Sequence, residues 1–149
     1  MVPQPTLDYN RVLFFALLWW GIVQFIKVPI YYLRYRKFNF GLWVSAGGMP
    51  SSHSSLVCAL ATGVALQEGL QSTAFAICFV LGMIVIYDAA GIRQAASIQA
   101  RLINKMIDEL FEGHPISEQR LKELLGHTRV EVFIGALMGV FGTLLLWNV

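Results

Sequence analysis

Several ionisable side chains stand inside or at the ends of long apolar segments, where a membrane would penalise them. Lys27 lies within the first apolar segment, and Arg34 follows it after six residues, which is about two helical turns. Burying one ionisable group in a spanning helix costs about 3 kcal/mol or more, so such residues are candidates for function. Two cations on one helix face can hold a dianion such as a phosphoryl group. An anchoring role for Lys27, with its ammonium reaching toward the interface, is the alternative.

A Pro-Ser-Ser-His run opens the second apolar segment. Proline suits the first turn of a helix, and Ser51 and Ser52 bring hydroxyl groups to the positive end of the helix dipole. With the N–H groups of the first turn, these hydroxyls would form a pocket for an anion. Ordinary capping of the helix by Ser51 or Ser52 is the alternative. His53 needs a polar partner at this position, and Gly47-Gly48 upstream would let the backbone approach a ligand closely.

His127 and Glu131 lie at the start of the last apolar segment. They are four residues apart, so on a helix the carboxylate could face the imidazole one turn away. Such a pairing fixes the ring tautomer and stabilises the imidazolium, as the orienting carboxylate does in a catalytic triad. Thr128 and Glu131 also fit a capping box, in which the carboxylate serves to start the helix. Both interpretations are open from the residues alone.

Asp88 and Arg93 bracket the end of the third apolar segment. An arginine there can supply a bidentate contact to a phosphate, and Asp88 could orient Arg93 or Lys27. A buried ion pair that closes the helix end is the alternative. Three histidines and scattered carboxylates form no metal-ligand pattern in the sequence, and we expect neither a metal nor a cofactor.

The composition indicates an integral membrane protein with an all-α fold. Of 149 residues, 56% are hydrophobic and only 13% are charged, whereas soluble domains carry about 25% charged residues. The apolar segments are close to the roughly 20 residues that a helix needs to cross a bilayer. We therefore predict one membrane-embedded domain over residues 1–149, a helical bundle of about four transmembrane helices. The predicted spans cover about 12–33, 50–70, 72–92 and 128–149, and Gly135-x-x-x-Gly139 in the last one is typical of a close helix-packing face.

The connector between the third and fourth spans contains an amphipathic segment. Over about 94–112, apolar residues recur at every third or fourth position and charged residues fall on the other face. We predict a helix that lies in the membrane interface, and docking onto a second copy of the chain is the alternative. A shorter helix is predicted over 117–125, ended by Gly126.

Every candidate residue falls on the same side of the predicted bundle. Four spans put both termini on one side and two connectors on the other, which we call the connector side. Ten of the eleven Lys and Arg residues lie on or next to the connector side, and only Arg11 lies at the other. By the positive-inside rule, the connector side is cytoplasmic, or stromal in a plastid. Cations that serve to bind a ligand would give the same distribution.

These motifs resemble the type-2 phosphatidic acid phosphatase superfamily, which also includes vanadium haloperoxidases. The superfamily pattern is Lys-x6-Arg-Pro, then Pro-Ser-Gly-His, then Ser-Arg-x5-His-x3-Asp. The chain carries Lys27-x6-Arg34, Pro-Ser-Ser-His53 and His127-x3-Glu131 in the same order, from residue 27 to about residue 140. The runs Gly-Gly-Met-Pro-Ser-Ser-His-Ser-Ser and Asp-Ala-Ala-Gly-Ile-Arg are similar to the small divergent branch found in bacteria and plant plastids.

The chain departs from the superfamily pattern at four positions. It has Tyr35 in place of proline, Ser52 in place of glycine, Glu131 in place of aspartate and Leu121 in place of the third-motif arginine. Arg93 would substitute for that arginine, with Arg120 or Arg129 as the alternatives. Superfamily members usually have six spans, so four spans suggest a minimal core or a need to form a homo-oligomer.

The resemblance implies hydrolysis of a phosphomonoester or diphosphate through a phosphohistidine intermediate, without a metal. His127 would attack phosphorus while Glu131 holds its tautomer, and protonated His53 would donate a proton to the leaving oxygen. The phosphate-binding residues implied by the resemblance are Lys27, Arg34, Ser51, Ser52 and Arg93, with Asp88 in support.

A membrane-embedded site predicts an amphiphilic substrate, such as a phosphatidyl or polyprenyl phosphate or diphosphate. We expect membrane lipids but no nucleic acid as partners, and a bacterial inner membrane or a plastid membrane as the location. The first alternative function is a lipid-phosphate binder or scaffold without catalysis. The second is a transporter or channel, which would distribute its charged residues along a pore. A haloperoxidase is disfavoured because the surroundings are a membrane.

Overall fold

A computed structural model describes residues 10–44, 47–110 and 128–148. The described residues contain helices and no strands, so the predicted all-α fold is confirmed. The predicted helix over 117–125 and His127 lie outside the described residues. The elements are α1 (Arg11–Tyr35), the 3-10 helix η1 (Phe40–Trp43), α2 (Ser52–Glu68), α3 (Thr73–Ala90), α4 (Ile92–Leu110) and α5 (Arg129–Leu146).

Three of these helices are long and apolar enough to cross a membrane, and they are α1, α3 and α5. The prediction of four spans is therefore confirmed only in part, because α2 has 17 residues and is less apolar. The reason lies in its surroundings. Helix α2 packs against α1, α3 and α5, and a helix enclosed by protein can carry serines that a lipid-facing helix could not.

Glycines let α5 approach α2 closely, as the Gly-x-x-x-Gly spacing predicts. A Cβ atom built on Gly135 would overlap the carbonyl oxygen of Ser51, and one built on Gly139 would overlap the carbonyl oxygen of Ser55. Gly142 makes a similar approach to the ring of Trp19 on α1. The first half of α5 is thereby held directly against the beginning of α2.

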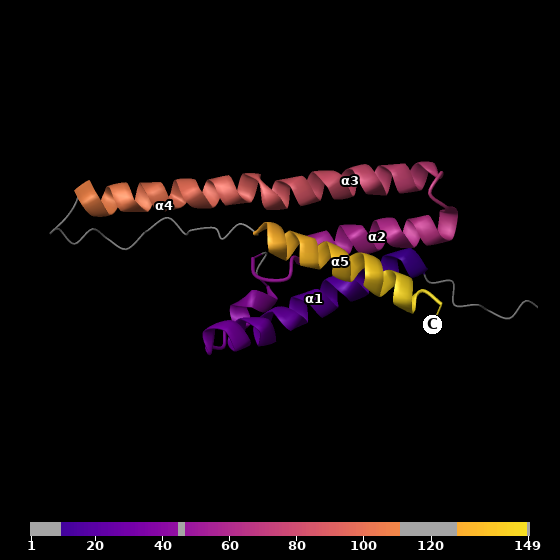
Figure 1. Ribbon diagram of the computed structural model, residues 1–149, viewed down its shortest axis with the longest axis horizontal. Coiled ribbons are helices and arrows are strands. Elements are labelled where there is room, and N and C mark those ends of the chain that lie inside the picture. Colours follow the sequence, from indigo (N-terminus) through magenta and orange to yellow (C-terminus); the bar gives the residue numbers. More distant parts are fainter. Residues whose placement is uncertain (1–9, 45–46, 111–127, 149) are drawn as a thin grey trace, which may run out of the picture.

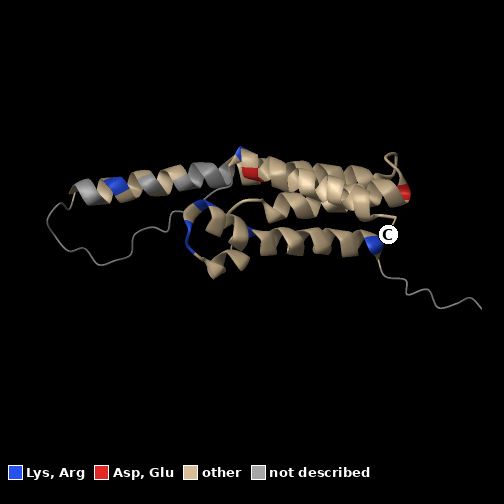
Figure 2. Ribbon diagram, turned by 60° about the horizontal axis from the view of Figure 1, so that its bottom comes forward, with Lys and Arg blue, Asp and Glu red and all other residues tan. Residues whose placement is uncertain are grey.

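The helix directions bring four helix ends together. Figure 1 shows that α1 and α3 end, and α2 and α5 begin, at the same end of the bundle, so the predicted connector side exists. Figure 2 shows that the described Lys and Arg residues also gather toward this end, while one lies at the start of α1. That residue is Arg11, whose guanidinium donates to the carbonyl oxygen of Trp147 just after α5 and lies 4.9 Å from its ring centroid.

The predicted amphipathic helix forms as α4, and it continues almost in line with α3 beyond the bundle (Figures 1 and 2). The third apolar helix ends earlier than predicted, at Gly91, whose N–H donates to the carbonyl oxygen of Tyr87. Among the described elements, α4 contacts α3 alone. Several of its described apolar side chains are exposed, among them Leu102 and Met106. Its location in the membrane interface stays a prediction.

After α1, the chain folds back along the helix that it has just left. Arg36 ends α1 in the left-handed region, with φ 54°. The returning chain is fastened by Gln24, whose side-chain amide donates to the carbonyl oxygen of Trp43 at 2.7 Å. The Trp43 indole N–H in turn donates to the carbonyl oxygen of Phe25 at 3.4 Å. That carbonyl lies four residues before Pro29, which has no N–H to bond it, so Trp43 replaces the missing donor.

Candidate functional site

Lys27 is the centre of a polar cluster at the connector side, which we call the Lys27 cluster. The other members are the buried serines Ser51, Ser52, Ser54 and Ser55 at the start of α2, and Glu131 of α5. The side chain of Lys27 is only 1% exposed, although it lies inside the apolar helix α1. The ammonium Nζ donates to Ser52 Oγ at 3.2 Å. Gly48, with φ 88°, lies beside it, since a Cβ there would come within 3.9 Å of Lys27 Cδ. The burial of Lys27 and its bond to Ser52 disfavour the anchoring interpretation.

Glu131 supplies the opposite charge, because its carboxylate attracts the Lys27 ammonium. It also forms the capping box that its spacing predicts. Thr128 N donates to Glu131 Oε2 at 3.0 Å, and Glu131 N donates to Thr128 Oγ1 at 3.3 Å. The backbone carbonyl of Glu131 accepts from Ser51 N at 3.0 Å. One residue thus starts α5, ties it to α2 and places a carboxylate near Lys27.

Four serines lie at the N-cap and in the first turn of α2, and all four are buried. Ser51 caps the helix, since its Oγ accepts from the backbone N of Ser54 at 3.4 Å and from Ser54 Oγ at 3.0 Å. The capping alternative is therefore confirmed for Ser51, whereas Ser52 faces Lys27. Ser55 Oγ is buried without a hydrogen-bond partner among the described residues. The positive end of the α2 dipole points into this hydroxyl-rich region.

The two predicted catalytic histidines stand next to this cluster in the sequence. His53 lies in the first turn of α2, immediately after Ser52, and it is half-buried. His127 lies outside the described residues, directly before Thr128, the N-cap of α5. The catalytic roles of both histidines, and the pairing of His127 with Glu131, stay predictions.

Arg34 is not part of the buried cluster. It lies in the last turn of α1, about 10 Å along the axis from Lys27 at 1.5 Å per residue. Its side chain is exposed, and the guanidinium lies 5.5 Å from the ring centroid of Tyr35. The two cations share a helix face, as the spacing predicts, but they stand at different depths.

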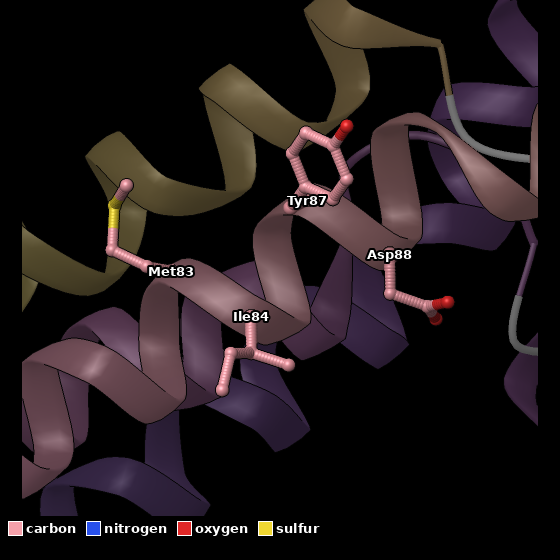
Figure 3. A pocket seen from close by; sticks show the side chains of 4 residues that line it. All are labelled: Met83, Ile84, Tyr87 and Asp88. Carbon is pink, nitrogen blue, oxygen red and sulfur yellow. The ribbon is translucent and has the colours of Figure 1, made fainter.

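Asp88 lies near the end of α3, half-buried, and it lines a hollow of about 450 Å³ on that helix. Met83, Ile84 and Tyr87 form the rest of the lining. Figure 3 shows these side chains fanning out from α3, with the Asp88 carboxylate directed away from Met83 and Tyr87. None of the lining residues belongs to the Lys27 cluster. Arg93 lies in the first turn of α4, and its side chain lies outside the described part of the chain.

Gln24, Ser54 and Ser55 belong to the surroundings of the site, although none of them is among the predicted site residues. Gln24 lies three residues before Lys27 on α1 and holds the returning chain. The signal for it is present in the sequence, because a polar amide inside an apolar span needs a partner. The signal for the two serines is the Ser-Ser repeat on either side of His53.

The arrangement can be compared with known proteins. A family model described as the divergent PAP2 family matches residues 9–142 of this chain. The chain belongs to the divergent PAP2 family. PAP2 denotes the type-2 phosphatidic acid phosphatases, so the resemblance carried by the Lys27, His53 and His127 motifs is confirmed. The match spans all four helix ends that meet at the connector side.

A curated relative supports the membrane assignment of this divergent PAP2 chain. The chain is 43% identical over 134 residues to a Bacillus subtilis (strain 168) protein named "Uncharacterized membrane protein YuiD". The aligned region covers 83% of the chain and 85% of the relative. No solved structure matches the chain. Membership in the family and the three apolar helices together indicate a membrane-embedded protein.

Proposed function

We propose that this protein is a membrane-embedded phosphatase that hydrolyses lipid phosphates or diphosphates through a phosphohistidine intermediate. The observation that carries the proposal is the buried Lys27, bonded to Ser52 and attracted by Glu131 where three helices meet. A buried ammonium is costly unless its charge is compensated. Serine hydroxyls and a helix dipole beside it provide the surroundings that bind a phosphate. Membership in the divergent PAP2 family supports this chemistry.

The proposed reaction begins with neutral His127. Its nitrogen forms a bond to phosphorus while the phosphorus–oxygen bond to the lipid breaks. Protonated His53 donates its proton to the departing alkoxide oxygen. His53 then takes a proton from water, the resulting hydroxide attacks phosphorus, and the bond to His127 breaks to release phosphate.

Charge on the transferred group would be stabilised by fixed groups of the chain. Lys27, Ser52 and the N-terminal end of α2 lie at the base of the cluster, where they would stabilise this charge. Glu131 is the carboxylate near Lys27, so in this proposal it orients Lys27 as well as His127. Arg34 and Arg93, with Asp88 in support, would act on the phosphate from nearer the membrane surface. These cations and the helix dipole supply the electrostatics, so the mechanism uses no metal.

The depth of Lys27 favours an amphiphilic substrate. Lys27 lies eight residues before the end of α1, which corresponds to about 12 Å along the helix axis. A phosphate attached to a membrane-anchored chain can reach this depth while its apolar tail remains in the bilayer. We propose phosphatidyl or polyprenyl phosphates and diphosphates as the substrate class, with the connector side facing the cytoplasm or stroma.

The first test measures phosphate release by the purified full chain from a panel of lipid phosphates. His127→Ala should reduce release to the uncatalysed background while the protein still inserts into the membrane. His114→Ala is the matched control, because His114 lies in the same connector and has no role in the mechanism. A His127→Ala variant with the parent's rate would contradict the phosphohistidine.

A second test addresses His53 through the leaving group. His53→Ala should slow hydrolysis of a natural lipid phosphate much more than hydrolysis of an activated aryl phosphate, because an aryl oxide leaves without a proton. Equal losses with both substrates would remove the general-acid role from His53.

The second candidate function is a lipid-phosphate-binding or scaffold protein without turnover. One observation favours it: the Glu131 carboxylate accepts from Thr128 N in the capping box that starts α5. Replacement of the third-motif arginine by Leu121 points in the same direction. This candidate predicts vanadate or phosphate binding that depends on Lys27, with no phosphate release from any lipid.

A further inference from the structure

An exposed row of aromatic rings lines the corner where the chain leaves α1 and folds back. Tyr32 stacks on Phe38 with ring centroids 4.3 Å apart, and Phe38 lies parallel to Phe40 at 5.8 Å. Phe40 contacts Trp43 at 5.4 Å, and Trp43 contacts Phe25 at 5.7 Å. We call these five residues the aromatic corner. It connects the last turns of α1 to η1 through ring contacts that involve no residue of the Lys27 cluster.

The aromatic corner is directed outward rather than into the bundle. Phe25 is 67% exposed, Phe38 63%, Phe40 60% and Trp43 42%. So many neighbouring exposed rings mark a surface that is covered by something apolar. Its position is also fixed, because the Trp43 indole donates to the Phe25 carbonyl and Gln24 holds the Trp43 carbonyl. The corner is therefore a rigid surface available to a partner outside the described fold.

Three exposed cations border the same corner, and they are Arg34, Arg36 and Lys37. The stretch 31–44 contains no Asp or Glu, so within it the charge is purely positive. Arg34 already lies against the Tyr35 ring. In Figure 2 the basic segments at the end of α1 lie at the turn that leads into η1. The hydrocarbon core of a bilayer would not accommodate this positive charge, whereas anionic lipid head groups complement it.

The depth of the row matches a membrane boundary. From Tyr32 back to Phe25 it follows seven residues of α1, or about 10 Å. The polar boundary on each side of a bilayer is about 5–8 Å thick, from a total of about 40–45 Å and a hydrocarbon core of about 30 Å. Aromatic side chains, and Trp and Tyr above all, collect at this level in membrane proteins. The row therefore spans the boundary, with the cations at its outer end.

We propose that the aromatic corner, together with Arg36 and Lys37, binds anionic phospholipid head groups of the leaflet on the connector side. The rings occupy the boundary between head groups and acyl chains, and Arg36 and Lys37 contact lipid phosphates. Because the corner is bonded to α1, this binding also fixes the level of Lys27 relative to the head groups. The inference does not depend on phosphate-ester hydrolysis.

The first experiment measures the depth of Trp43 in the full chain reconstituted into bilayers. The Trp43 emission is obtained as the difference between the parent and Trp43→Phe. A nitroxide on the lipid head group should quench this emission more strongly than a nitroxide deep in the acyl chain. Stronger quenching by the deep label, or equal quenching by a soluble iodide and both labels, would overturn the proposed depth.

The second experiment measures lipid selectivity in detergent at 0.15 M salt by native mass spectrometry, with phosphatidylglycerol and phosphatidylcholine as probes. Arg36→Gln/Lys37→Gln should weaken phosphatidylglycerol binding about 30-fold, which is about 1 kcal/mol per cation, and leave phosphatidylcholine binding unchanged. Lys105→Gln/Lys122→Gln is the matched control. It removes two positive charges from the connector between α3 and α5 and should change binding by less than about 3-fold.

Two outcomes would overturn the proposal. Equal loss of phosphatidylglycerol binding in both double variants would make the effect one of net charge rather than of the corner. A change in oligomeric state of Arg36→Gln/Lys37→Gln without a change in lipid binding would assign the corner to a protein contact. The aromatic part is tested by comparing Phe38→Ser/Phe40→Ser with Phe38→Leu/Phe40→Leu. Only the serine pair should change the quenching pattern that reports the depth of Trp43.

Discussion

Gly135→Ala is the substitution that tests most sharply how α5 is held against the site. The added methyl group would overlap the Ser51 carbonyl oxygen and lie 3.1 Å from both Ser51 N and C. Backbone atoms cannot rotate away, so α5 must shift, and overpacking of this kind costs about 3 kcal/mol at the upper end of the usual range. The alanine gains about 1 kcal/mol of helix propensity. The expected net loss of stability is therefore about 2 kcal/mol.

Gly21→Ala is the matched control, because a Cβ built on Gly21 meets nothing within 4 Å. It has the same propensity gain without the overlap, so it should be as stable as the parent or more stable by up to about 1 kcal/mol. The assay is reversible unfolding in mixed detergent and dodecyl sulfate micelles, followed by circular dichroism. The two variants should differ by about 3 kcal/mol. Equal stabilities would refute the close contact between α5 and the first turn of α2.

Two further predictions concern helix ends and use the same unfolding assay. Trp43→Phe should lower the free energy of unfolding by about 1 kcal/mol in the parent. In a Pro29→Ala background the loss should be smaller, because the alanine N–H then bonds the Phe25 carbonyl in place of the indole. A coupling energy of zero between the two substitutions would show that Trp43 does not replace the donor missing at Pro29. Arg11→Met should cost about 1–2 kcal/mol by removing the cation from the α5 end and from the Trp147 ring. The exposed Arg129→Met should stay within about 0.5 kcal/mol of the parent, and an equal effect of both arginine substitutions would show that the Arg11 contact is unimportant.

Much of the fold follows from apolar length alone, but the number of spans does not. Hydropathy measures how well a helix tolerates lipid, and α1, α3 and α5 are apolar helices that the described bundle leaves largely unburied. Helix α2 is enclosed by the other three and carries buried serines such as Ser54 and Ser55. Similarly, the periodicity of α4 predicts which face is apolar, but the direction of the helix is set by the backbone at Gly91.

The residues of the candidate site could be predicted from the sequence better than the contacts between them. Lys27 and Ser52 stand out because polar groups in apolar segments are costly, and the structure brings them into contact. The nearness of Glu131 to Lys27 could not be read from spacing, because it depends on how α5 crosses α2. That crossing is set by Gly135 against Ser51. The exposure of Arg34 could not be read from its spacing to Lys27, because it depends on where α1 leaves the bundle.

The central claim is that the buried Lys27 cluster is a phosphate site that turns over lipid phosphates. The most direct measurement is the initial rate of phosphate release by the purified full chain, compared between Lys27→Met and the matched exposed Lys105→Met, with folding checked by circular dichroism. The account predicts release by the parent and by Lys105→Met, and a loss of about 100-fold or more in Lys27→Met, as expected for a group that stabilises charge in the transition state. Release from folded Lys27→Met at the parent's rate would contradict the account.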